Sequence, residues 1–385
     1  MVIVLSSNCF YAWLSIIQTA RCPRNHRDES WPLRPSNLVE MAIATSQARR
    51  GADLLDAARA GDENAFAQIV EDYRAEIHTH CYRMLGSVHD AEDALQDTFV
   101  RAWRGRRGFK GQSALGTWLY RIATNACLDV IVRRRKARAL PIDYGAPSTA
   151  DADVGQPLVE SVWVEPYPDE ALGVVDGYAA PEARYEQREA VELAFIAALQ
   201  HLPARQRAVL IMRDVLGFSA REASESLETS VASVNSALQR ARKTAEERLP
   251  ERTQQATLRS LGDERVRELV EAYIEAWARR DVAAVAALLV EEAVFSMPPW
   301  SRWWRGREMI AGFAGDELCA EIRSVATRAN GQPAVASYAF DAKTGRFVAA
   351  AIDVLTLEGA LIREMTAFVA PEMFPRFNLP QELAA

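Results

Sequence analysis

Apolar residues recur at three- and four-residue steps along most of residues 51–250, which is the spacing of amphipathic helices. Several helices are predicted within 51–138, and two more over 182–199 and 203–216. After residue 262 the pattern changes to three short helices and then four strands. The helices span 263–280, 281–289 and 307–313, and the strands span 322–327, 334–340, 347–357 and 360–369.

Turn-forming pairs separate the predicted strands. Asn330-Gly331 lies between the first two strands, and Glu358-Gly359 lies between the last two. Asn-Gly is a strong signal for a tight hairpin. Helices followed by an apolar antiparallel meander predict a compact α+β domain at the C-terminal end of an otherwise helical chain.

The segment from Ser219 to Arg242 has the pattern of a helix-turn-helix. Ser219 and Glu222 form a capping box, S-x-x-E, and Ser230 is placed to cap a second helix. The apolar residues of that helix form one stripe, which must face a core. Its outward side chains are polar or basic, as suits base edges and phosphates in a major groove. They are Ser233, Asn235, Ser236, Gln239 and Arg240.

The net charge of −7 by itself argues against nucleic-acid binding, but the charges are segregated. Between residues 99 and 138 there are eleven Lys and Arg residues and one acid, Asp129. Residues 139–183 then carry nine acids and no Lys or Arg. A basic block beside an acidic one produces strong local fields, so the total charge does not exclude DNA as a partner.

The length of 385 residues suffices for two or three domains, and the composition, 49% hydrophobic and 25% charged, is globular. The five cysteines lack the spacing of disulfide frameworks or metal sites, which indicates a reducing cytosol. None of the five histidines pairs with a cysteine in a zinc-like pattern. No metal and no other cofactor is therefore predicted.

Residues 1–48 form an N-terminal extension that can be interpreted in two ways. Met1 to Ala20 is uncharged and fairly apolar, as in a signal peptide or a short membrane anchor. It lacks a basic start, and no small-residue cleavage site is obvious. We therefore expect a disordered extension, or a misplaced start codon with the true start at Met41, and no membrane attachment.

Five strings occur in a fixed order along residues 51–250. They are AGDENAF (60–66), DAEDALQDTFVRAW (90–103), FKGQSALGTWLYRIATNACLD (109–129), LPARQRAVLIMRDVLGFS (202–219) and SVASVNSALQRAR (230–242). This order resembles the extracytoplasmic-function (ECF) group of the sigma-70 family, the promoter-recognition subunits of bacterial RNA polymerase. The last domain resembles the SnoaL-like cone fold. The string WVEPYPD (163–169) is typical of sigma factors with that domain fused.

The resemblance implies a multidomain protein with two all-α sigma domains, a region 2 helical bundle and a region 4 helix-turn-helix, and a C-terminal α+β SnoaL-like cone-fold domain. It implies a cytoplasmic transcription-initiation factor, not an enzyme, whose partners are core RNA polymerase and promoter DNA. The expected parts are the extension (1–48), region 2 (49–138), an acidic linker (139–182), region 4 (183–250) and the SnoaL-like domain (263–385).

In this family the helix that begins DAED docks on the polymerase clamp, and the flap is a second contact. The polar face of that helix here comprises Glu92, Asp93, Gln96 and Asp97. The plain alternative is a solvated helix face with favourable acids near its N-terminus.

The basic segment 109–138 resembles the reader of the −10 promoter element, which holds flipped bases by stacking and by its positive charge. The loop residues implied as contacts are Lys110, Gln112 and Ser113. The helix residues are Trp118, Tyr120, Arg121, Thr124 and Asn125, although Trp118 also fits a core position. Arg133, Arg134, Arg135 and Lys136 extend the helix as a phosphate-binding tail.

The helix-turn-helix resembles the reader of the −35 element. Phosphate contacts, which position the protein without specifying sequence, are implied for Arg205, Arg207, Arg242 and Lys243. Base contacts are implied for Ser233, Asn235, Ser236 and Gln239, with Ser230 and Arg240 beside them.

The acidic linker joins the two predicted DNA readers. The linker would pass through a polymerase channel that normally holds nucleic acid, where its carboxylates would mimic phosphates. The bland alternative is a solvated, disordered tether.

The C-terminal domain raises the question of a ligand. Relatives of the cone fold include enzymes that use Asp/His pairs, but no histidine follows His201. Four carboxylates remain, Asp316, Glu317, Asp341 and Asp353, and nothing in the sequence marks one as a buried base. A pocket for a small molecule, an ordinary core or an interface would each explain the cluster of Met297, Trp300, Trp303, Trp304 and Phe313. The resemblance implies that this domain regulates the sigma domains by intramolecular contact.

Two other functions fit parts of the pattern. One is a helix-turn-helix regulator that is not a sigma subunit, which would have no use for the DAED helix or the basic helix. The other is a SnoaL-like enzyme fused to a DNA-binding module, against which the missing histidine argues.

Overall fold

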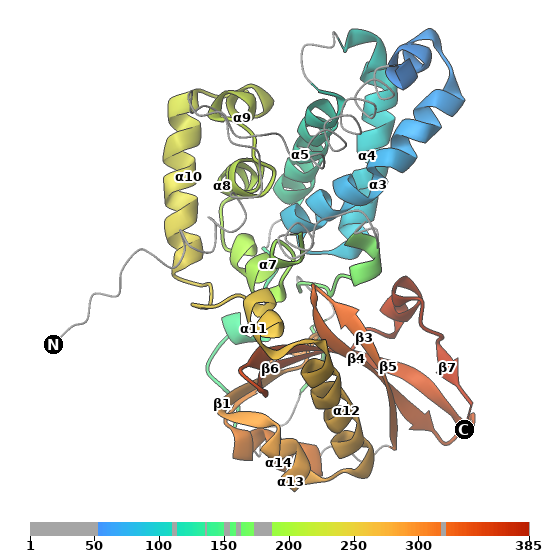
Figure 1. Ribbon diagram of the computed structural model, residues 1–385, viewed down its shortest axis with the longest axis vertical. Helices are drawn as coiled ribbons and strands as arrows, with labels where there is room; N and C mark the ends of the chain where they lie inside the picture. Colours follow the sequence, from blue (N-terminus) through green and yellow to red (C-terminus); the bar gives the residue numbers. More distant parts are fainter. Residues whose placement is uncertain are drawn as a thin grey trace, which may run out of the picture.

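The computed structural model describes residues 53–109, 114–134, 137–149, 155–158, 163–172, 187–316 and 321–384, without the side chains of 313–316. The predicted N-terminal extension, the loop 110–113 and Arg135-Lys136 lie outside these residues. Two helical bodies stand side by side above a domain built on a sheet (Figure 1). Among the described residues, no helix is both long and apolar enough to cross a bilayer.

The first helical body contains three long helices, α3, α4 and α5. They span Glu63–Leu85, Val88–Gly105 and Leu115–Arg133, with the 3-10 turn η1 at Arg106–Gly108. Asp62 caps α3 by accepting from the backbone N–H groups of Asn64 and Ala65, and Ser87 caps α4 by accepting from that of Asp90. The apolar stripes of the three helices face one another, as the sequence pattern predicts.

The second helical body carries the predicted helix-turn-helix. Its helices are α7 (Leu193–Gln200), α8 (Ala204–Leu210), α9 (Ala220–Ser226) and α10 (Val231–Glu246), with the π-helical turn η4 at Ile211–Val215. Between region 4 and the C-terminal domain lies a further helix, α11, at Gln254–Leu261, which Thr253 caps.

The C-terminal domain consists of a mixed β-sheet and helices, and the long helix packs on one face of the sheet. The helices are α12 (Asp263–Arg279), α13 (Val282–Ala287) and α14 (Arg307–Asp316), with the 3-10 helix η5 at Pro371–Phe377. The strands are β1 (Leu289–Ser296), β2 (Trp303–Arg305), β3 (Ile322–Ala329), β4 (Gln332–Asp341), β5 (Arg346–Glu358), β6 (Leu361–Phe368) and β7 (Glu382–Leu383). Their order is β2-β1-β6-β5-β4-β3, with β7 beside β5; β1 and β6 are parallel and the other pairs antiparallel.

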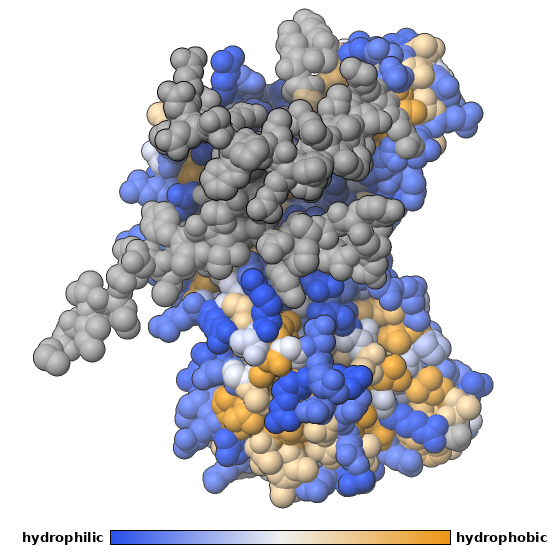
Figure 2. Space-filling model, in the orientation of Figure 1, coloured by the Kyte–Doolittle hydropathy of each residue, from blue (hydrophilic) through white to orange (hydrophobic). Residues whose placement is uncertain are grey.

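Four predicted strands and both predicted hairpin turns are present in this sheet. The sequence pattern missed β1, β2 and β7, because they are short or begin where an alanine-rich helix ends. Figure 2 shows apolar residues gathered over the end of the molecule where α13 and α14 lie.

Two hydrophobic cores divide the sheet. One face, with Leu355 of β5, packs on Tyr273 and other apolar residues of α12. The opposite face, with Tyr338 and Ile352, belongs to one core that continues into both helical bodies. The C-terminal domain is therefore fused to the helical bodies by shared packing and not only by the chain.

The described part of the acidic linker is packed against the rest of the molecule. It contains the 3-10 turns η2 (Pro141–Asp143) and η3 (Asp169–Leu172). Within WVEPYPD, Trp163, Val164 and Tyr167 are buried. For this segment the alternative of a solvated tether is wrong, because its aromatic and apolar side chains fill space between the helical bodies and the sheet.

Candidate nucleic-acid interface

The helix-turn-helix presents one polar face to solvent. Both sides of the capping box are formed, since the Ser219 hydroxyl accepts from the Glu222 N–H and the Glu222 carboxylate from the Ser219 N–H at 2.7 Å. Ser230 caps α10 through the Ser233 N–H at 3.1 Å. Val234, Leu238 and Ala241 are buried, so the predicted base readers point outward. Exposed on this face are Ser230, Ser233, Asn235, Ser236, Gln239 and Arg240.

A hollow of about 660 Å³ lies between η4 and α10 beside this face. Its lining is largely basic and amide-bearing, and includes Arg213, Asn235, Gln239, Arg242 and Lys243. Arg213 is absent from the sequence prediction, because only the fold brings η4 next to α10. Such a lining suits the anionic backbone of a nucleic acid.

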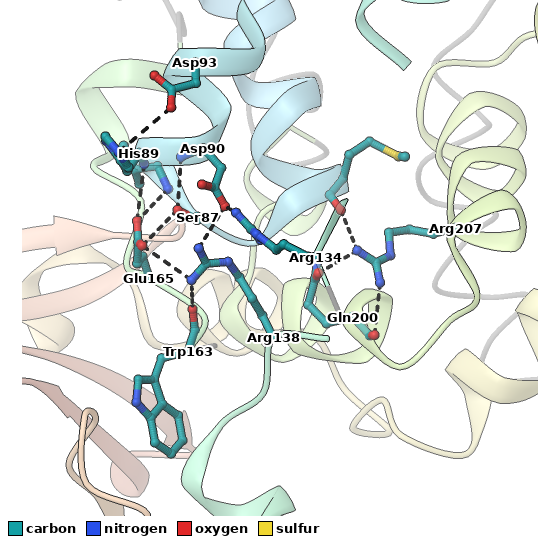
Figure 3. Close-up of polar contacts among 12 residues, drawn as sticks. Ser87, His89, Asp90, Asp93, Arg134, Arg138, Trp163, Glu165, Gln200 and Arg207 are labelled. Carbon is teal, nitrogen blue, oxygen red and sulfur yellow. Dashed lines mark hydrogen bonds and ion pairs between the residues drawn. The ribbon is translucent and has the colours of Figure 1, made fainter. Parts of the chain in front are cut away.

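The prediction that Arg207 contacts a DNA phosphate is wrong, because its side chain is not accessible in this structure. Its side chain is 4% exposed and donates to the carbonyls of Met84 (2.5 Å) and Gln200 (3.0 Å) (Figure 3). It also donates to the Leu202 carbonyl (3.2 Å). The same guanidinium donates to Gln200 Oε1 at 2.6 Å. Arg207 therefore joins α8 to the end of α3 and does not face outward.

The other predicted phosphate contacts differ in availability. Arg205 and Lys243 are exposed. Arg242 forms a two-pronged ion pair with the buried Asp214, at 2.9 and 2.7 Å. This pair fixes α10 against η4, which orients the recognition helix.

The predicted −10 helix, α5, is partly covered. Thr124 is a correction, because it is fully buried and bonded to His80 at 2.9 Å and to the Tyr120 carbonyl at 2.7 Å. Trp118 packs on Phe109, with 4.9 Å between ring centroids, as a core position would require. Tyr120 lies edge-on to Phe218 of the second helical body, at 6.0 Å between ring centroids.

Some predicted −10 residues lie outside the description: Lys110, Gln112, Ser113, Arg135 and Lys136. In the described part of the basic tail, Arg133 is exposed and donates to the Asp129 carbonyl at 3.2 Å. Arg134 is paired with Asp90 at the start of α4. Part of the tail is thus engaged inside the protein.

The predicted polymerase face of α4 is open in its middle. Asp93 and Gln96 are exposed, whereas Glu92 lies 3.6 Å from His78 and Asp97 pairs with Arg101 at 2.7 Å. The N-terminus of α4 is capped from the linker. There the Glu165 carboxylate accepts from the Ser87 hydroxyl (2.8 Å) and from the N–H groups of Val88 (2.8 Å) and His89 (3.3 Å) (Figure 3).

Asn330, at the turn of the β3–β4 hairpin, joins all three parts of the molecule. It is fully buried in the left-handed conformation, with φ of 56°. Its amide nitrogen donates at 2.8 Å to the Tyr82 hydroxyl and to the Val191 carbonyl, and its amide oxygen accepts from the Tyr167 N–H at 2.9 Å. The sequence predicted the turn, but nothing local signalled its burial.

Tyr167 transmits this contact to the helical bundle. Its hydroxyl lies 2.8 Å from His78 Nδ1 and 3.1 Å from Thr79 Oγ1. Its ring packs on Tyr82, with 4.4 Å between centroids. The linker aromatic is thus held between the hairpin of the C-terminal domain and helix α3.

Of the three alternatives for the tryptophan cluster of the C-terminal domain, its described side chains support a core and an interface. Trp304 is fully buried in the core, and Trp300 and Trp303 donate from Nε1 to the linker carbonyls of Gly155 (3.1 Å) and Gly145 (3.0 Å). Met297 packs at the edge of the same core. The side chain of Phe313 lies outside the description. The described members of the cluster form core and a linker interface.

Asp353 is the buried carboxyl that the sequence could not single out. It lies on the helical face of the sheet and accepts from the Tyr273 hydroxyl at 3.1 Å and the Ser337 hydroxyl at 3.4 Å. Burial raises its pKa to about 6, against the lowering effect of these hydroxyls. Among the described residues, no group of three or more His, Cys, Asp or Glu side chains is arranged to hold a metal.

Comparison with known proteins agrees with this arrangement. The chain matches Sigma-70 region 2 over residues 69–138, Sigma-70 region 4 over 186–244 and the SnoaL-like domain over 270–365. It is 39% identical over 355 residues to the ECF RNA polymerase sigma factor SigG of Mycobacterium tuberculosis, covering 90% of each chain. The chain belongs to the ECF sigma factors.

Further relatives match different shares of this ECF sigma factor. SigW of Bacillus subtilis is 32% identical over 193 residues, which is 49% of this chain and 91% of SigW. The crystal structure of SigJ of Mycobacterium tuberculosis has a TM-score of 0.51 at 18% identity, covering 82% of this chain and 99% of SigJ. The first likeness covers about half of this chain, whereas the second covers most of it.

Membership of the family gives the chain its partners. A sigma factor binds core RNA polymerase and promoter DNA, and directs transcription initiation. In this sigma factor the polar face of the helix-turn-helix is exposed to solvent, whereas α5 of the predicted −10 reader contacts region 4. The contacts that the sequence missed, those of Glu165, Tyr167, Phe218 and Asn330, all join parts that are distant in the chain.

Proposed function

We propose that the C-terminal domain of this sigma factor inhibits it by holding regions 2 and 4 together. The supporting observation is that the two readers touch. Arg121 of α5 lies 3.3 Å from Glu228 in the turn of the helix-turn-helix. The −10 and −35 elements lie about 25 base pairs apart, which is about 85 Å of B-DNA at about 3.4 Å per base pair. The two regions must separate before both elements are bound.

The β3–β4 hairpin supports the closed arrangement. Asn330 bonds region 2, the linker and the start of region 4, as described above. The neighbouring Gln332 accepts from the Leu193 N–H at the start of α7, at 2.9 Å. The Gly331 N–H donates to Asp169 of the linker at 2.7 Å. One turn of the C-terminal domain thus ties together every part that must move.

The remaining roles follow the family pattern. Asp93, Gln96 and their neighbours on α4 are assigned to the polymerase clamp, and region 4 to the flap and the −35 duplex. Arg121 and Tyr120 are assigned to the −10 strand. The protein acts in the cytoplasm, where the polymerase is, and its C-terminal domain works by contact and not by catalysis.

A substitution at Gly331 that adds a Cβ tests whether the C-terminal domain inhibits the protein. A Cβ there would lie 2.9 Å from Arg188 Cβ and 3.1 Å from the Arg188 carbonyl, so Gly331→Ala pushes the hairpin away from region 4. Gly359→Ala is the matched control, because its φ of 58° imposes the same strain and no atom lies within 4 Å. We expect Gly331→Ala to raise run-off transcription with core polymerase several-fold and Gly359→Ala to leave it unchanged.

The opposite results are also informative. If Gly331→Ala lowers transcription while Gly359→Ala does not, the C-terminal contact is required for activity and inhibition is wrong. Equal rates for all three proteins would mean that closure does not limit initiation.

A further inference from the structure

Region 4 covers the predicted −10 helix with an acidic side chain. Arg121 Nη2 donates to Glu228 Oε1 at 3.3 Å across 107 residues of sequence. Next to this pair, Tyr120 packs on Phe218. The exposed face of α10 takes no part in these contacts, so the closed molecule masks one reader and leaves the other accessible.

Glu228 holds this position against a local backbone cost. It has a φ of 52°, in the left-handed region that is unfavourable for residues other than Gly, Asn and Asp. A glycine would make the same turn without strain. The side chain is 78% exposed, so burial does not explain a glutamate at this turn. Backbone strain of this kind is a pointer to a role for the residue.

We propose that Glu228 is a latch that mimics a DNA phosphate on Arg121, and that the −10 strand must displace it. This rests on the proposed closed state. A carboxylate and a phosphate both accept charge-assisted hydrogen bonds from a guanidinium, so a DNA phosphate that reaches Arg121 competes with Glu228 for it. An exposed ion pair is weak, which suits a contact that has to be exchanged.

Three substitutions at one position separate charge from strain. Glu228→Gln keeps the shape and the left-handed backbone and removes the charge. Glu228→Gly removes both charge and strain, and Glu228→Lys reverses the charge at equal strain. Glu225→Gln is the matched control, because Glu225 makes an exposed ion pair with Arg221 at 2.9 Å within α9 alone.

The first readout is binding of two probes to the full-length chain with core polymerase. For a fluorescent single strand carrying the −10 sequence, we expect tighter binding of about two- to fivefold in Glu228→Gln and more in Glu228→Lys. Duplex −35 DNA binds Glu228→Gln and Glu228→Gly as it binds the parent. If Glu228 has only a structural role, none of the variants binds the −10 strand more tightly than the parent does.

Glu228→Gly also serves as a control for misfolding. Because it relieves the backbone strain, its denaturation midpoint should equal or exceed that of the parent. A charge swap, Arg121→Glu with Glu228→Arg, is expected to restore the close approach of regions 2 and 4 in a fluorescence-transfer measurement. It does not restore −10 binding. Unchanged −10 binding in all three Glu228 variants of a chain that still initiates overturns the latch alone. Transcription that Gly331→Ala lowers, while Gly359→Ala does not, overturns the proposed function instead.

Discussion

Buried carboxyls sit where the domains meet. Glu192, just before α7, is almost fully buried and accepts from the Gln255 N–H at 2.8 Å. Burial raises its pKa to about 8, although hydrogen bonds from the backbones of Gln254 and Gln255 lower it. Three residues away, Glu189 accepts from the Thr253 hydroxyl at 2.8 Å, and burial raises its pKa as well. We therefore expect the joint between region 4 and α11 to respond to proton binding.

Glu192→Gln should change how stability depends on pH. A raised folded pKa stabilises the protein below the unfolded value of 4.5, and this contribution is lost as pH rises towards about 8. Relative to Glu192→Gln, the parent should lose up to about 1.4 kcal/mol per pH unit in this window. The measurement is the free energy of unfolding by denaturant from pH 5 to 8. The exposed Glu251→Gln is the control, and parallel curves for parent and Glu192→Gln would contradict the prediction.

At the scale of elements, α4 depends on a distant segment for its start. Its own cap is Ser87, but Glu165 of the linker takes two further backbone N–H groups of the first turn. A carboxylate at a helix N-terminus also interacts favourably with the helix dipole. The Glu165 carboxylate is joined to Arg138, whose guanidinium also pairs with Asp90 at 2.8 Å. The helix predicted to face the polymerase is therefore coupled to the linker.

Removal of this cap should loosen α4 locally. We expect Glu165→Ala to cost about 1–2 kcal/mol, because the Ser87 hydroxyl and two backbone N–H groups lose this partner. Amide hydrogen exchange at Val88 and His89 should quicken, while exchange in the middle of α4 changes little. Glu71→Ala on the exposed side of α3 serves for comparison. Unaltered exchange at Val88 would show that Ser87 alone suffices.

At the scale of the whole molecule, the β3–β4 hairpin holds the three parts together through a few buried polar groups. Loss of a partner leaves buried donors or acceptors unsatisfied, at about 1–3 kcal/mol each. A small change at this turn therefore has a larger effect than exposed ion pairs elsewhere, which are worth about 0–1 kcal/mol.

Asn330→Gly should open the molecule. Glycine accepts the left-handed turn but leaves the Tyr82 hydroxyl, the Val191 carbonyl and the Tyr167 N–H without this partner. We expect a loss of about 2 kcal/mol in unfolding free energy and a larger radius of gyration by X-ray scattering. Asn378→Gly is the comparison, since Asn378 is left-handed, with φ of 53°, but exposed. Equal effects of the two substitutions would remove the special role of the hairpin.

Local patterns predicted most of the elements and their caps. The capping box at Ser219, the stripe of α10 and the Asn330-Gly331 turn all depend on neighbours within a few residues, and all are present. The same patterns separated an α+β domain from the helical part, because strand and helix differ in hydrophobic period. The predicted polymerase and base-reading faces were assigned from such local spacing and remain predictions.

The sequence by itself determined the family, the order of the domains and the identity of the helix-turn-helix, because these follow from short-range spacing and from ordered motifs. Only the tertiary structure decided which polar residues are available. Arg207 and Thr124 look like DNA contacts in the sequence, yet packing of region 4 and α3 buries them. The pairing of Arg121 with Glu228 and the burial of Asn330 depend on segments more than 100 residues apart. No local periodicity encodes such contacts, because they arise only when whole domains share a core.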